Sequence, residues 1–134
     1  MFRIAIRAAV LALEATAPAA AEEFREVRDR TSFVSLLQRK QLTRLGIRLD
    51  VPETGKISGR AFGKQVSGEW RWQDGFFCRD LDFGQQDLGA NCQAVKVDGD
   101  TVRFIADRGA GDHADLSLRQ AQKSTAIPFF SQSP

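Results

Sequence analysis

Residues 66–83 (VSGEWRWQDGFFCRDLDF) have the pattern of two antiparallel strands joined by a tight turn. In the first half, small and apolar side chains alternate with polar ones, which places Trp70 and Trp72 on one face. The Asp-Gly dipeptide at 74–75 is the strongest short signal for a hairpin turn in the chain. The alternation resumes in residues 76–83, so this stretch predicts a β-hairpin with one face turned toward a core.

The same alternation extends along the chain in both directions from this hairpin. Further strands are expected at 42–51, 56–62, 92–97, 101–106 and 114–118. In the first of these, Thr43, Leu45, Ile47, Leu49 and Val51 are expected to face the core, and Leu42 falls on the opposite face. A longer connection is expected at 84–89. The pattern predicts an all-β antiparallel meander of about seven short strands, curled into a small barrel or, as the alternative, a two-layer sandwich.

A short helix is expected before the strands. Asp29 or Thr31 can cap it by accepting a hydrogen bond from a free backbone N–H group. Phe33, Leu36 and Leu37 follow at helical spacing and fall on one face. A helix of about two turns is unstable alone, so this face must dock, and we expect it to close one end of the β domain.

Residues 1–21 (MFRIAIRAAVLALEATAPAAA) have the features of a cleavable leader. Arg3 supplies the positive start, an apolar stretch follows, and three alanines precede Glu22, where we expect cleavage. A signal peptide implies a periplasmic or secreted protein. Because Arg7 and Glu14 interrupt the apolar stretch, the N-terminal helix of a cytosolic protein is the alternative, and the stretch does not suffice to span a membrane.

The rest of the chain is expected to form a single β domain, 22–119, and a polar tail, 120–134, that is disordered or loosely docked. The formal net charge is +2, and acidic and basic residues are interspersed. A nucleic-acid partner requires a basic patch, which this distribution does not provide. We expect no membrane span in the mature chain and a monomeric protein.

The chain has two cysteines, Cys78 and Cys92. They fall on consecutive expected strands, and facing Cα atoms of antiparallel neighbours lie about 4.5–5.5 Å apart, within the range that a disulfide accepts. The sequence therefore predicts one disulfide, which would fasten the connection at 84–89 at the rim of the fold. Two free, buried cysteines are the alternative. A structural disulfide is typical of exported proteins.

Few residues are candidates for chemistry. Residues 107–115 (DRGAGDHAD) contain the only histidine, His113, but neither a triad motif nor a complete set of zinc ligands. One Gly/Asp turn of this kind is a weak calcium signal. Asp80 and Asp82 lie on one strand face rather than across a cleft, unlike the carboxylates of glycosidases. We therefore predict no catalytic residues, no metal and no cofactor.

A ligand pocket is the remaining candidate site, because the interior of a small barrel can hold one small ligand. The expected lining residues are Trp70, Trp72, Phe77, Phe83, Arg103 and Phe104. Arg103 or Arg71 would be the polar anchor. The alternative is that the aromatic side chains fill the core, and alternation alone does not separate a hollow interior from a packed one.

The chain contains two specific motifs: W-x-W-x-D-G-x-F-C-R at 70–79 and L-G-x-N-C-Q at 88–93. The region that includes them, 24–119, resembles a group of small exported proteins of alphaproteobacteria. Members of that group are often labelled dihydrodipicolinate reductase, which implies an NAD(P)H-dependent enzyme of lysine synthesis. Such an enzyme needs a glycine-rich strand–turn–helix. The glycine clusters at 55–63 and 109–111 are flanked by expected strands, so the sequence does not predict this activity.

The chain is also similar to the small periplasmic inhibitors of secreted metalloproteases in its leader, its size and its G-x-W hairpin. Those are exported barrels with one disulfide, in which an N-terminal segment enters the protease cleft, and residues 22–30 would play that part here. Three hypotheses follow. The first is a non-catalytic periplasmic domain that binds a partner protein or a small ligand, the second is a protease inhibitor, and the third is the reductase.

Overall fold

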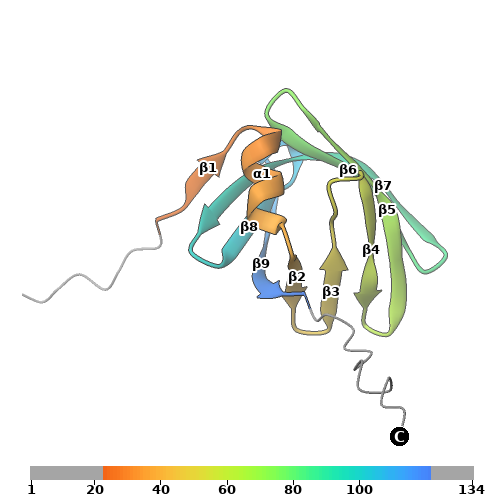
Figure 1. The fold of residues 1–134 in the computed structure, drawn as a ribbon. Coiled ribbons are helices and arrows are strands. Elements are labelled where there is room, and N and C mark those ends of the chain that lie inside the picture. Colours follow the sequence, from red (N-terminus) through yellow and green to blue (C-terminus); the bar gives the residue numbers. More distant parts are fainter. Residues whose placement is uncertain (1–22, 122–134) are drawn as a thin grey trace, which may run out of the picture.

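The computed structural model describes residues 23–121, and the expected leader and most of the expected tail lie outside the described residues (Figure 1). The elements are β1 (Arg25–Val27), α1 (Arg30–Leu37), β2 (Lys40–Arg44), β3 (Ile47–Asp50), β4 (Lys56–Ala61), β5 (Lys64–Gln73), β6 (Phe76–Phe83), β7 (Gln86–Asp98), β8 (Thr101–Ile105), the 3-10 turn η1 (Asp107–Gly109) and β9 (His113–Gln120). Strand β9 thus extends one residue past the domain boundary expected from composition.

Strands β2 to β9 form a closed antiparallel barrel of eight strands. Each strand pairs with the next one along the chain, and β9 returns to pair with β2. The short strand β1 pairs with β7 outside this circuit. The predicted all-β meander, its closure into a small barrel and the single short helix are therefore confirmed.

The stretch 42–51 forms two strands rather than one, which accounts for the eighth strand of the barrel. The chain reverses at Leu45 and Gly46, so that Arg44 pairs with Ile47 and Leu42 with Leu49. Gly46 has a φ of +78°, a left-handed conformation that glycine adopts without strain. The prediction that Leu45 faces the core is wrong, because its side chain is 93% exposed at the tip of the turn. The assignment of Leu42 to the outer face is wrong as well, because Leu42 is buried in the core.

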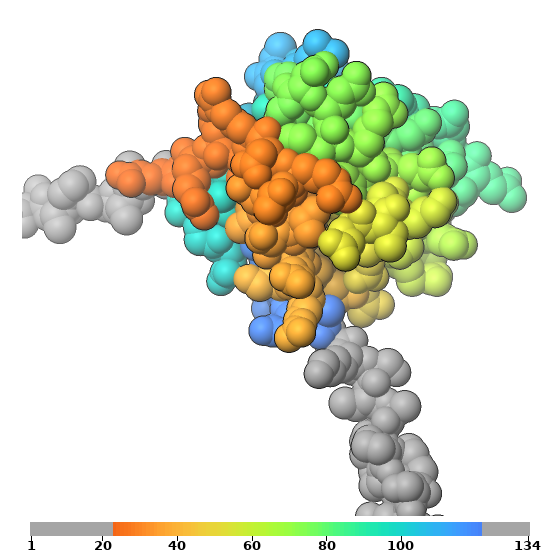
Figure 2. Space-filling view, turned by 45° about the horizontal axis from the view of Figure 1, so that its top comes forward, coloured from red at the N-terminus to blue at the C-terminus, as the bar shows by residue number. Residues whose placement is uncertain are grey.

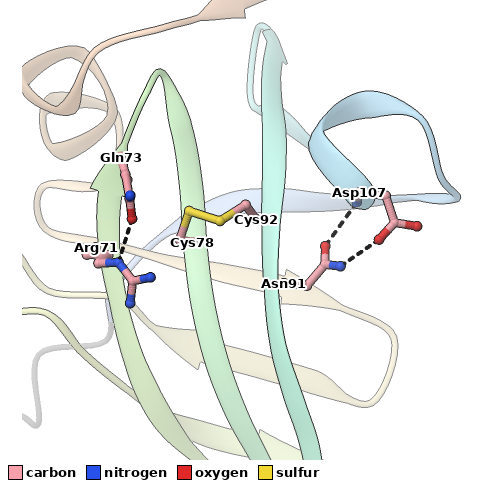
Figure 3. Close-up of a disulfide and its surroundings, with 6 residues drawn as sticks. All are labelled: Arg71, Gln73, Cys78, Asn91, Cys92 and Asp107. Atoms are coloured by element: carbon pink, nitrogen blue, oxygen red, sulfur yellow. Dashed lines mark hydrogen bonds between the residues drawn. A yellow bond between two sulfur atoms is a disulfide. The ribbon is translucent and has the colours of Figure 1, made fainter.

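The predicted disulfide between Cys78 and Cys92 is present, and the two residues are direct partners in the β6–β7 register. It lies on the outer face of the barrel and joins the two strands within their length (Figure 3). The expected loop at 84–89 is instead a turn at 84–85 followed by the first residues of β7. The disulfide therefore ties two paired strands together rather than fastening a loop at the rim.

Helix α1 closes one end of the barrel, as expected. The Asp29 carboxylate accepts a hydrogen bond from the Ser32 backbone N–H at 2.9 Å and caps the helix. Hydrogen bonds from the backbone and side chain of Ser32 lower the pKa of Asp29. Phe33 is fully buried and Leu37 nearly so. Figure 2 turns this end forward and shows the orange segment that contains α1 seated among neighbouring yellow and green segments.

An aromatic cluster fills the closed end beneath α1. The Phe33 ring centroid lies 5.3 Å from Trp70, 5.1 Å from Trp72 and 5.0 Å from Phe77. Both indole N–H groups donate to backbone carbonyls of the covering segments, one to Pro52 at 2.9 Å and the other to Arg28 at 3.0 Å. These bonds satisfy the polar atoms of two largely apolar side chains, so the cluster is a packed core.

In the part of the chain that the structure describes, no helix is both long enough and apolar enough to cross a membrane.

Candidate functional site

The barrel interior contains a cavity of about 290 Å³ on the side of Phe77 and Phe104 away from α1. The two rings, 5.4 Å apart, contact the Phe33 cluster and separate the cavity from the packed end. Aliphatic side chains from five strands, and one from the residue that follows β3, form most of the remaining wall: Leu42, Leu49, Val51, Ile57, Leu81, Ala114 and Leu116. The barrel is therefore packed in one half and hollow in the other.

Four polar side chains also line this cavity: Arg79, Gln93, Asp112 and His113. Asp112 and His113 are exposed and lie where β9 begins, so they mark the mouth. Arg79 comes from β6 and shares its face with Phe77 and Leu81, which places it on the inner surface. Its guanidinium is only partly exposed to solvent.

The Arg79 guanidinium donates a hydrogen bond from Nη1 to the backbone carbonyl of Gly89 at 2.8 Å. Burial lowers the pKa of this group, and the charge of nearby Asp80 offsets part of that effect. Arginine nevertheless remains charged in proteins. Of the described residues that line the cavity, most are apolar and Arg79 is the one cation.

The structure places the six predicted pocket residues in four different environments. Phe77 and Phe104 line the cavity. Trp70 and Trp72 belong to the packed cluster at the closed end, and Phe83, near the tip of β6, lies under the Lys64 ammonium at 5.2 Å. None of these last three is among the residues that line the cavity in the described part of the chain.

Arg103, the sixth, lies on the outer face and not in the cavity. It donates two hydrogen bonds to the Asp115 carboxylate, at 2.8 and 2.9 Å, and stacks on the Phe24 ring at 3.9 Å. These bonds lower the pKa of Asp115. The alternative anchor, Arg71, is exposed and donates to Gln73 on the outer face of β5 (Figure 3).

Sequence reasoning missed Arg79 as the polar group of the cavity. The signal was present, because Arg79 is two residues from both Phe77 and Leu81 in a strand with a period of two. The same alternation places Asp80 and Asp82 outside with Cys78, where they are exposed.

The turn at 107–115 is organised by hydrogen bonds within the protein. Asn91 donates to the Asp107 carboxylate at 2.8 Å and accepts from the Asp107 backbone N–H at 3.1 Å (Figure 3). Within residues 23–121, no group of three or more His, Cys, Asp or Glu side chains is arranged to hold a metal ion.

No protein-family model, no curated protein sequence and no solved structure matches this chain. The resemblance of residues 24–119 to the exported alphaproteobacterial group remains a prediction.

Proposed function

We propose that this domain binds a small, largely apolar molecule inside the open half of its barrel and has no catalytic role. The observation that carries the proposal is the cavity of about 290 Å³, closed by the aromatic cluster on one side and open beside Asp112 and His113 on the other. Ligand pockets are typically concave and mainly apolar, with a few placed polar groups, and begin at about 300 Å³. This cavity has that composition and lies near the lower end of that range.

We further propose that the protein is periplasmic or secreted. The Cys78–Cys92 disulfide supports this location, because structural disulfides persist in oxidising compartments and are rare in the cytosol. The expected signal peptide, residues 1–21, lies outside the described residues.

Protease inhibition has less support from the structure. The segment that would enter a protease cleft contains β1, which pairs with β7, and Arg28, whose carbonyl accepts the Trp72 indole N–H. Residues 25–28 are thus held against the barrel. The reductase hypothesis has no support from the fold. The glycines at 55–63 lie in and around the β4–β5 hairpin, whereas a dinucleotide-binding site needs them before a helix.

The test is binding of N-phenyl-1-naphthylamine, a neutral apolar dye that fluoresces in apolar surroundings. We expect saturable binding with a stoichiometry of one. Ala114→Phe places a ring in the cavity and should abolish binding, whereas Ala90→Phe, the same change on the outer face of β7, should leave it unchanged. Thermal unfolding followed by circular dichroism establishes that both variants fold.

If the wild type does not bind the dye, or if both variants bind it as well as the wild type does, the proposal is wrong. If Ala114→Phe does not fold, nuclear Overhauser effects between the dye and the Leu49 and Leu116 methyl groups of the wild type test whether the dye binds in the cavity. Both side chains line the cavity, so the absence of these effects would contradict the proposal.

A further inference from the structure

Among residues 23–121, no carboxylate is paired with the Arg79 cation at the inner surface of the barrel. Its neighbours in register on the two flanking strands are Trp70 and Asn91, neither of which carries a charge. Asn91 already uses its side-chain amide on Asp107. Within residues 23–121, the only hydrogen-bond acceptor for the Arg79 guanidinium is the Gly89 carbonyl, and no carboxylate forms an ion pair with it.

This arrangement is costly for the folded protein unless something else compensates. A guanidinium has five N–H donors and keeps its charge, and placing it beside apolar walls removes part of its hydration. One neutral carbonyl replaces only a small part of what water supplied. Two other cations of the barrel do have a carboxylate partner, since Arg103 meets Asp115 and Lys56 meets Glu69.

In the part of the chain that the structure describes, the cavity has no carboxylate in a position to pair with Arg79. Of the described residues that line it, only Asp112 is acidic, and Asp112 is exposed at the mouth and forms no ion pair with Arg79. Asp80 follows Arg79 on β6 but projects to the outer face. A bound anion would therefore be the first charged partner of the guanidinium inside the cavity.

We propose that the ligand is a small monocarboxylic acid with an aliphatic or aromatic body, whose carboxylate pairs with Arg79 while its body lies against the apolar wall. This inference rests on the proposed ligand-binding function and specifies its ligand class. A carboxylate fits a guanidinium through two parallel hydrogen bonds, the strongest common pairing of this kind. Because Asp112 at the mouth would repel a second negative charge, a dicarboxylic acid fits less well.

The cavity volume sets the size of the acid. An apolar cavity of about 150 Å³ takes benzene, which has six heavy atoms. A cavity of about 290 Å³ therefore takes roughly ten to twelve heavy atoms, if the packing is similar. Octanoate has this size, and octan-1-ol is its uncharged counterpart with the same chain.

The experiment compares octanoate with octan-1-ol by isothermal titration calorimetry at pH 7, using the wild type, Arg79→Met and Arg71→Met. Methionine keeps an unbranched apolar stem like that of arginine but removes the guanidinium, with its charge and its donors. Arg71→Met is the matched control, because Arg71 is exposed on the outer face of the adjacent strand β5. All three proteins are first compared by thermal unfolding.

We expect the wild type to bind octanoate at least tenfold more tightly than octan-1-ol, because hydrogen bonds to charged groups are worth about 1.5–3 kcal/mol and 1.4 kcal/mol is tenfold. Arg79→Met should lose at least tenfold in octanoate affinity while binding octan-1-ol unchanged. Arg71→Met should behave as the wild type does.

Three outcomes would overturn the inference. Equal affinity of the wild type for the acid and the alcohol, no effect of Arg79→Met on the acid, or an equal loss in Arg71→Met would each remove Arg79 as the anchor. In each case, binding of the alcohol and of the neutral dye would still support the proposed binding of apolar molecules in the cavity. Failure of both molecules and of the dye would instead overturn the proposed function.

If Arg79→Met does not fold, the wild type alone decides between these outcomes. The ¹⁵Nε resonance of Arg79 should shift on titration with octanoate and stay in place with octan-1-ol. No shift with saturating octanoate would contradict the inference.

Discussion

Replacement of Phe33 by alanine is the most direct test of how the barrel is closed. Phe33 is 0% exposed, although it lies on a helix of eight residues that cannot be stable alone. Its ring contacts Trp70, Trp72, Phe77 and Phe104, with centroid distances between 5.0 and 6.4 Å. Removing the ring thus leaves a void between the helix and the barrel.

The expected cost follows from the size of that void. Phe→Ala changes at buried sites cost about 3–5 kcal/mol, which combines the lost transfer free energy with the cavity left behind. Total stability of a domain is about 5–15 kcal/mol, so this one change removes a large part of it. Phe33→Leu retains most of the volume but loses the ring contacts, and should cost about 1.5 kcal/mol.

The assay is equilibrium unfolding in urea, followed by tryptophan fluorescence. Trp70 and Trp72 are the only tryptophans of the chain, and both contact the Phe33 ring, so their emission reports on this cluster directly. Ser35→Ala, an exposed change on the same helix, is the control and should leave the free energy of unfolding nearly unchanged. A cost below about 1 kcal/mol for Phe33→Ala would refute the reasoning, because the helix would then contribute little to the core.

Three further predictions concern other parts of the barrel. Removing the disulfide through the double variant Cys78→Ala/Cys92→Ala should cost about 3 kcal/mol, measured by thermal unfolding, because the bond closes a loop with a sequence separation of 14. Gly59→Ala should cost more than about 1 kcal/mol in urea unfolding, because Gly59 has a φ of +154° and a Cβ there would lie 2.0 Å from a carbonyl oxygen of β3. Asp115→Asn should reduce stability at pH 7, and this effect should shrink as the pH falls below about 4. Since Arg103 lowers the pKa of Asp115 in the folded state, the stabilisation is present above pH about 4 and is lost as the pH falls through the folded pKa.

Each of these predictions has a contradicting result. An unchanged melting temperature in the double cysteine variant would show that the cross-link does not limit the unfolded chain. A neutral Gly59→Ala would mean that β3 and β4 can separate without cost. A stability difference for Asp115→Asn that stays constant from pH 7 to pH 3 would show that the carboxylate charge plays no part.

The sequence predicted the elements whose signals are local. Asp29 and Phe33 marked the helix, and the Asp-Gly turn at 74–75 marked the β5–β6 hairpin. The consecutive strands expected at 76–83 and 92–97 brought Cys78 and Cys92 together. The β2–β3 turn was missed because it has two residues and shifts the phase of the alternation by one. Leu45 therefore looked like a continuation of the core-facing set, although the turn itself exposes it.

The cavity was less predictable than the fold. The alternation of Phe77, Arg79 and Leu81 shows which side chains face inward, but not whether the space between them is filled. That depends on how far α1 and the two tryptophans reach into the barrel, which local sequence does not determine. The tryptophans turned out to occupy the packed half, so the pocket lies beyond them, around Arg79.

The closure of the barrel has a consequence for the order in which the chain can fold. The seam joins β2 to β9, and Thr43 donates a hydrogen bond to the Ser117 carbonyl across 74 residues of sequence. Until β9 is available, β2 and β8 each present a free edge, and free edges invite pairing with other chains. The seam also makes the contact order high, which slows folding. A ribosome or translocation pore that still holds β9 therefore holds back completion of the whole barrel.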